Sequence, residues 1–156
     1  MKKIFYVLTT LLLFLTLSCT SATPTLTKEQ YREYTTRVIN SDYKTVFKSV
    51  LSVLQDQKYI IQNSDFNNGL INAERESKLN DSLVDVIEER RSNMKASFLL
   101  SEKEPKKTNV RVTLQESKKG YDANFSYNVI DVVNIQKKEV YDNIFNEINK
   151  EIEMNK

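Results

Sequence analysis

The 156-residue chain lacks histidine and contains one cysteine, two glycines and two prolines. Without histidine the protein has neither the usual proton shuttle at neutral pH nor the commonest metal ligand. A Ser–His or Cys–His nucleophile is therefore excluded. One cysteine can form neither an intramolecular disulfide nor a cysteine-rich zinc site. The small number of glycines and prolines argues against a low-complexity region.

Motifs for catalysis or cofactor binding are also missing. The chain has no glycine-rich phosphate loop, Walker motif or nucleophile elbow. Asp81 and Asp85 would share one helix face and could bind a cation or act as acid and base, but a solvated charged surface explains them more simply. We predict no catalytic residue, no metal and no cofactor, and we expect a protein that is not an enzyme.

One long apolar run is present, from Ile4 to Leu17, preceded by Lys2 and Lys3. It is shorter than the roughly 20 residues that a membrane-spanning helix needs. A positive start, an uncharged apolar run and a small residue after it are the layout of a secretory signal peptide. After Leu17 no apolar stretch approaches spanning length. We therefore predict that residues 1–18 direct export.

The end of this run, Leu15-Thr16-Leu17-Ser18-Cys19, resembles the lipobox of bacterial lipoproteins. The resemblance implies cleavage between Ser18 and Cys19, a diacylglyceryl group on the Cys19 sulfur and acylation of the new amine. The commonest lipobox has leucine in place of Thr16 and a small residue in place of Leu17. The alternative is an ordinary signal followed by a chance cysteine. A single thiol at this one position of an exported chain favours the lipoprotein interpretation.

These features divide the chain into residues 1–18 as signal peptide, 19–27 as lipidated cysteine and polar tether, and 28–156 as a single domain. Two or more acyl chains anchor a protein stably. We expect the protein to lie on the cell membrane or outer membrane, outside the cytoplasm, held in the lipid bilayer by acylated Cys19. The net charge of +2 belongs to the two lysines of the signal. Nucleic-acid binding is therefore disfavoured.

Hydrophobic periodicity outlines the domain. Alternation predicts a strand over 31–39, and apolar spacing predicts an amphipathic helix over 42–57 with Ser41 or Asp42 as N-cap. Asn68-Gly69 is the strongest hairpin signal in the chain, because both residues tolerate positive φ. It joins a strand that begins at Tyr59 to a strand over 70–75.

The second half alternates in the same way. The segment 80–91 is ambiguous, because its apolar residues suit a helix face or a strand; we expect a short helix or an irregular excursion there. The remaining pattern predicts strands over 94–100, 110–115 and 123–129, polar turns at 102–108 and 117–120, and an amphipathic helix over 136–154. The expected fold class is α+β: an antiparallel sheet of about five to six strands with two main helices packed on one face.

Parts of this domain resemble a family of uncharacterised bacterial lipoproteins that share a "Leu-Gln-Asp, aromatic strand, Gly-Leu-Ile-x-Ala" core. The matching segments are Thr36-Arg37-Val38, Val53-Leu54-Gln55-Asp56, Gly69-Leu70-Ile71-Asn72-Ala73 and Val140-Tyr141 through Phe145. The family commonly has glycine where this chain has Lys58. The element order is also similar to the helix-grip domains of the C subunit of the outer-membrane β-barrel assembly machinery. Neither resemblance implies a catalytic motif.

Two groups of side chains are candidates for contact with other molecules. Phe98, Phe125 and Phe145 could hold a ligand between sheet and helices, and Tyr121, Phe125 and Tyr127 could line a groove. More often such aromatics form the core. The lysines at the two predicted turns could touch anionic headgroups or simply aid solubility; they are Lys103, Lys106, Lys107, Lys118 and Lys119.

Two functions follow as hypotheses. The first is a non-enzymatic, membrane-anchored lipoprotein of the cell envelope that acts as a structural or protein-binding module, with an envelope protein as partner. The alternative is a carrier or sensor of a small apolar ligand bound between sheet and helices.

Overall fold

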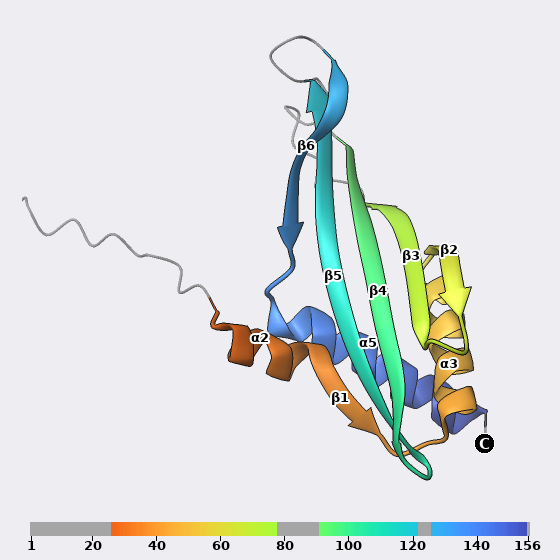
Figure 1. Cartoon of the computed structure of the whole chain (residues 1–156). Helices are drawn as coiled ribbons and strands as arrows, with labels where there is room; N and C mark the ends of the chain where they lie inside the picture. Colours follow the sequence, from red (N-terminus) through yellow and green to blue (C-terminus); the bar gives the residue numbers. More distant parts are fainter. Residues whose placement is uncertain (1–25, 78–90, 122–125, 156) are drawn as a thin grey trace, which may run out of the picture.

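The structure, a computed structural model, describes residues 26–77, 91–121 and 126–155. These residues form three helices and one antiparallel sheet of six strands (Figure 1). The elements in chain order are α2 (Lys28–Thr35), β1 (Thr36–Ile39), α3 (Tyr43–Asp56), β2 (Ile60–Asp65), β3 (Leu70–Ser77), β4 (Arg91–Glu104), β5 (Lys107–Tyr121), β6 (Tyr127–Asn134) and α5 (Lys138–Met154). The α+β class and the antiparallel sheet predicted from the sequence are confirmed.

The sheet is built around the long β4–β5 hairpin. Its strand order is β1-β5-β4-β3-β2, and β6 pairs with β5 as well. Because β4 occupies one edge of β5, both β1 and β6 lie along the other edge, β1 at Thr108–Arg111 and β6 at Gln115–Tyr121. Figure 1 shows β6 beside the upper half of β5 and β1 beside the lower half.

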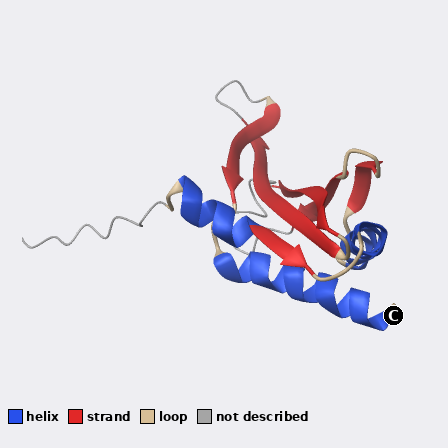
Figure 2. Ribbon diagram, turned by 60° about the horizontal axis from the view of Figure 1, so that its bottom comes forward, coloured by secondary structure: helices blue, strands red, loops and turns tan. Residues whose placement is uncertain are grey.

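The hydrophobic core lies between the sheet and the two long helices, α3 and α5, which pack on one face of the sheet (Figure 2). Strands β4 and β5 contribute every second residue to it, as their alternation predicts. The largest fully buried apolar side chains are Val46, Val50, Leu54, Ile71, Phe98, Val110, Val112, Leu114, Tyr141 and Ile148. The other sheet face has no described helix over it.

The predicted strand over 31–39 is wrong in its first half, because α2 extends to Thr35 and the strand begins at Thr36. A capping box starts the helix: the Gln30 N–H donates to Thr27 Oγ1 at 3.3 Å, and the Thr27 N–H donates to Gln30 Oε1 at 3.0 Å. Tyr31 then packs edge-on against Tyr141 of α5, with ring centroids 6.1 Å apart. The cap and this tertiary contact override the alternating pattern.

Most other predicted elements are confirmed, with shifted ends. The helices expected over 42–57 and 136–154 are α3 and α5. The predicted turn at 117–120 is wrong, because β5 continues through it and Lys118 and Lys119 pair with residues of β6. Strand β6 begins at Tyr127, later than the predicted 123–129, and runs on to Asn134. Of the ambiguous segment 80–91, all but Arg91 lies outside the described residues.

The hairpin predicted at Asn68-Gly69 joins β2 to β3, but only Gly69 of this pair has positive φ, at 69°. The side chain of Asp65 organises the turn instead. Its Oδ1 accepts hydrogen bonds from the N–H groups of Asn67 and Asn68 at 2.9 and 3.0 Å. The backbone hydrogen bond from Asn68 is the main reason that the pKa of Asp65 lies below its ordinary value.

Candidate binding surface on the open face of the sheet

The structure accounts for only part of the site predicted from sequence. Ser18, Cys19 and Phe125 lie outside the described residues, as do the side chains of Tyr121 and Tyr127. Phe98 on β4 and Phe145 on α5 both belong to the core, with 2% and 3% of each residue exposed. A ligand would have to displace core packing to reach either ring.

The acidic pair Asp81 and Asp85 also lies outside the described residues. Within residues 26–77, 91–121 and 126–155, no three His, Cys, Asp or Glu side chains gather as a metal site would require. Among the same residues, no helix combines the length and hydropathy needed to cross a membrane.

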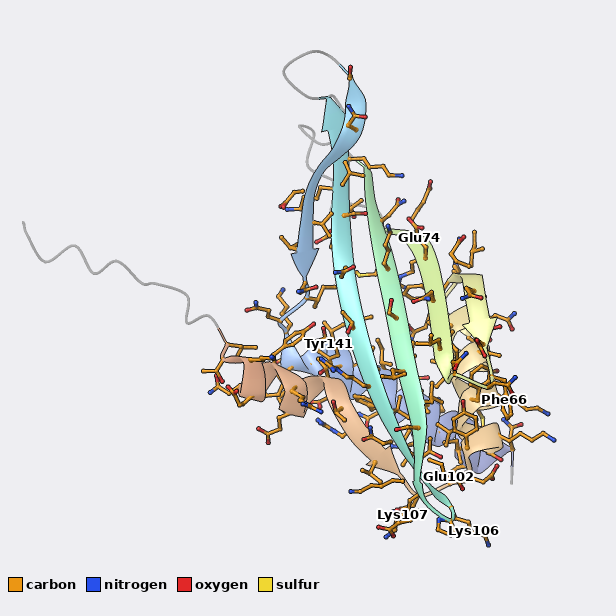
Figure 3. The ribbon with its side chains drawn as sticks, viewed as in Figure 1. Phe66, Glu74, Glu102, Lys106, Lys107 and Tyr141 are labelled. Carbon is orange, nitrogen blue, oxygen red and sulfur yellow. The ribbon has the colours of Figure 1, made fainter. Side chains whose placement is uncertain are left out.

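The predicted lysine clusters lie in different places. Lys103, Lys106 and Lys107 are exposed at the tip of the β4–β5 hairpin, where Lys107 Nζ forms an ion pair with Glu104 Oε2 at 2.7 Å (Figure 3). Lys118 and Lys119 are half-buried within β5. The acids at the hairpin tip neutralise part of its positive charge, which favours the solubilising interpretation.

The more informative surface is the open face, which we define as the sheet face opposite α3 and α5. Side chains alternate between the two faces of a strand, and the paired registers identify those that share this face. Its members include Val38, Ile60, Leu70, Asn72, Glu74, Lys95, Ser97, Leu99, Arg111 and Thr113.

Aliphatic side chains stand exposed on this face. Leu70 of β3 and Leu99 of β4 are directly opposite each other, and they are 40% and 45% exposed. Ile60 at the start of β2 is 68% exposed, and Val38 on β1 is 44% exposed. Single exposed aliphatics are normal, but a cross-strand pair on a sheet face that none of the described helices covers forms a contiguous apolar contact area.

Polar groups adjoin the leucine pair. Glu74 Oε1 accepts a hydrogen bond from Asn93 Nδ2 at 2.7 Å, and Lys95 stands directly opposite Glu74 in the sheet (Figure 3). A shallow pocket of about 240 Å³ opens among Asn72, Glu74, Lys95 and Ser97. The open face thus combines an apolar strip with charged and amide groups of both donor and acceptor type.

The sequence contains one signal for this surface that pattern analysis did not use. In β4, Leu99 occupies the outward register with Lys95, Ser97 and Ser101, where alternation predicts a polar residue. Leu99 therefore places an aliphatic side chain on the face of β4 that alternation otherwise makes polar. The partner of Leu99 across the sheet, Leu70, is recognisable only once the register is known.

Comparisons with known proteins add little to this description. No family model matches the chain, and no curated protein matches it. Among solved structures, the fold is similar to that of a DUF4468 family protein from Bacteroides ovatus, at 12% identity and a TM-score of 0.41. The similarity covers 75% of this chain and 84% of that chain. At these values it carries no argument about function.

Proposed function

We propose that this protein is a lipid-anchored lipoprotein of the cell envelope whose α+β domain binds a partner envelope protein through its open face. The observation that carries the proposal is the Leu70–Leu99 pair, exposed on a sheet face that no described helix covers. The domain acts by binding and carries out no chemical step.

The anchor part of the proposal rests on the sequence. An export signal is followed by Ser18 and by Cys19, the only thiol of the chain. Helix α2 begins at Lys28, directly after the polar tether 19–27. A tether of this length would keep the domain, and with it the open face, within a few nanometres of the lipid surface. The partner would therefore be a protein of the same envelope compartment.

The binding part rests on the energetics of the open face. Covering the exposed portion of each leucine would contribute about 1 kcal/mol. Charged residues stand beside the exposed aliphatic side chains: Arg111 is opposite Leu99, and Glu74 is opposite both Ile60 and Lys95. These charges would set the orientation and selectivity of binding by charge complementarity. Polar groups around an apolar centre are the usual composition of a specific protein interface.

The experiment is site-specific photocrosslinking of the full-length protein in its own cells. A photoreactive residue at Ser97, between the two leucines and Lys95 on the open face, should crosslink to one envelope protein. The same residue at Gln55, exposed on α3, is the positional control and should not give that product.

The Leu70→Ser/Leu99→Ser double variant should lose the Ser97 crosslink. The control change Val133→Ser/Met154→Ser removes two exposed apolar side chains that lie outside the open face, one on β6 and one at the end of α5, and should retain it. If Ser97 yields no crosslink, or a crosslink that survives the double leucine change, the open face is not the binding surface.

A further inference from the structure

A second surface feature lies on the opposite side of the sheet from the open face. It is a pocket of about 290 Å³ where the first turns of α5 meet the sheet and the end of α3. Its lining residues are Gln57, Tyr59, Arg75, Met94, Leu114, Val140, Asn143 and Ile144. The volume is at the lower end of the range for small-molecule sites.

Among the described residues that line the pocket, Arg75 alone is charged, and two contacts hold its side chain in place. Its guanidinium carbon lies 4.6 Å from the centroid of the Tyr59 ring, and its Nη1 donates to the carbonyl oxygen of Gln57 at 3.0 Å. The Arg75 side chain is half-buried, and none of the ion pairs between described residues includes it. A guanidinium has five N–H donors, and the contact to Gln57 uses only one of them. The Arg75 side chain is therefore held in position with further N–H groups that can donate to a ligand in this pocket.

The rest of the lining is mainly apolar. Met94, Leu114, Val140 and Ile144 provide aliphatic and thioether surface, and Asn143 adds one amide. The contacts with Tyr59 and with the Gln57 carbonyl orient the Arg75 guanidinium. Neither partner carries a negative charge, and none of the ion pairs between described residues includes Arg75. The pocket therefore has an apolar wall with one oriented positive group.

We propose that this pocket binds a small apolar carboxylate. The carboxylate would accept hydrogen bonds from the Arg75 fork, and the hydrocarbon part would lie against Val140, Met94 and Ile144. A phosphate is less suitable, because it brings more charge and more acceptors than one guanidinium and one amide can satisfy. The site gives a location to the small-ligand alternative raised by the sequence, with residues other than Phe98 and Phe145. It is independent of the protein-binding function proposed for the open face.

The chain supplies its own reporters for a test. Of its three methionines, Met94 lines the pocket, whereas Met154 is 67% exposed at the far end of α5. We would label the methionine methyl groups with carbon-13 in the full-length protein, held in lipid nanodiscs, and titrate with hexanoate. The Met94 signal should shift and saturate, while the Met154 signal should not move. Hexan-1-ol has the same hydrocarbon chain without the charge. Its dissociation constant, measured from the same Met94 signal, should be at least tenfold higher than that of hexanoate.

Two variants separate the carboxylate contact from the pocket itself. Arg75→Gln should weaken hexanoate binding about tenfold, because it removes a charge-assisted hydrogen bond. The matched control Arg32→Gln removes an exposed arginine from α2, outside both proposed sites, and should leave hexanoate binding unchanged. Val140→Phe keeps Arg75 but fills the pocket, and should abolish the Met94 shift. Circular dichroism confirms that each variant is folded.

The proposal is overturned by either of two results. One is a Met94 signal that hexanoate does not move. The other is a shift that hexan-1-ol reproduces or that persists in Val140→Phe, in which case Arg75 serves only to cap α3. Should Arg75→Gln fail to fold, Val140→Phe and the alcohol comparison still decide the question.

Discussion

At the residue scale, Gly69 is a position where a side chain cannot be added without moving the backbone. Its φ is +69°, and a Cβ built on it would lie 2.1 Å from the carbonyl oxygen of Leu100. Its own carbonyl accepts a hydrogen bond from the Leu100 N–H at 2.8 Å. Phe66 in the same hairpin contacts α3: the centroid of its ring lies 5.0 Å from that of Tyr43 and 5.2 Å from that of Phe47. The β2–β3 turn is thus tied both to β4 and to α3.

We expect Gly69→Ala to lower the free energy of unfolding by about 2–4 kcal/mol, since it combines left-handed strain with displacement of the Leu100 carbonyl and loss of a hydrogen bond. Urea denaturation of the two proteins measures the difference. Asn67→Ala, a change at an exposed turn residue two positions earlier, is the control and should cost less than about 0.5 kcal/mol. Equal losses for the two variants would contradict the role given to Gly69.

Asp42 gives a prediction about pH. Its Oδ1 accepts from the Thr45 N–H at 3.0 Å, and its Oδ2 accepts from Thr45 Oγ1 at 2.7 Å. The side-chain hydrogen bond, followed by the backbone one, holds the pKa of Asp42 below its ordinary value of 3.8. Because the folded pKa is lowered, the carboxylate contributes its full stability above the unfolded pKa and loses it as the pH falls through the folded pKa.

Asp42→Ala should therefore destabilise the protein by about 1 kcal/mol at neutral pH, the usual effect of removing an N-cap. The difference from the parent protein should shrink as the solution is acidified below pH 3.8. Urea denaturation across this range measures both effects. Asp56→Ala, at the other end of α3, should be neutral or slightly stabilising, because an acid is unfavourable near a helix C-terminus. A pH-independent difference for Asp42→Ala would exclude the capping carboxylate as its cause.

At the element scale, the end of α3 shows how a helix is stopped without glycine. The Tyr59 N–H donates to the Leu54 carbonyl at 2.8 Å and the Lys58 N–H to the Gln55 carbonyl at 2.9 Å, the pattern of a Schellman motif. Lys58 accordingly has φ of 63°. Glycine adopts the left-handed conformation without a Cβ penalty, so glycine would suit this position.

Lys58→Gly should raise the free energy of unfolding by about 1 kcal/mol, because it relieves a side chain held in the left-handed region. Lys48→Gly, at an exposed position inside α3, is the matched control and should lower the same quantity by about 1 kcal/mol. Thermal unfolding distinguishes them. If Lys58→Gly destabilises the protein as Lys48→Gly does, the left-handed conformation of Lys58 does not cost measurable stability.

The elements also show where periodicity fails. Residues 31–39 alternate like a strand, yet the first five form the end of α2, because the Thr27-x-x-Gln30 capping box starts a helix that α5 then holds through Tyr141. The Thr27-x-x-Gln30 pattern is a helix-start signal that can be recognised in the sequence, and the alternation of 31–39 does not take account of it. Similarly, Lys118 and Lys119 resemble a turn until the pairing partner β6 is known. Charged residues are compatible with a strand whose faces are partly exposed to solvent.

At the scale of the whole molecule, the proposed lipid anchor gives the clearest prediction. Cys19→Ala should abolish incorporation of an alkyne-labelled fatty acid and leave an unprocessed or mis-sorted precursor, because the acceptor sulfur is lost. In-gel detection of the label measures this. Ser18→Ala preserves a small residue before the cysteine and should keep both labelling and processing. Label that persists in Cys19→Ala would show that the lipid, if any, is attached elsewhere.

Periodicity, caps and turn residues are local patterns, and from them the fold class and the α3–hairpin unit could be predicted. A short N-terminal motif likewise leads us to expect export and anchoring, which remain predictions. Tertiary structure decided the rest. The pairing register brings Leu70 opposite Leu99 across two strands, and packing of α5 brings Asn143 and Val140 to Arg75. Both candidate binding surfaces join residues far apart in the chain. No local pattern records such neighbours, because strand order and helix docking arise only when the whole core is buried.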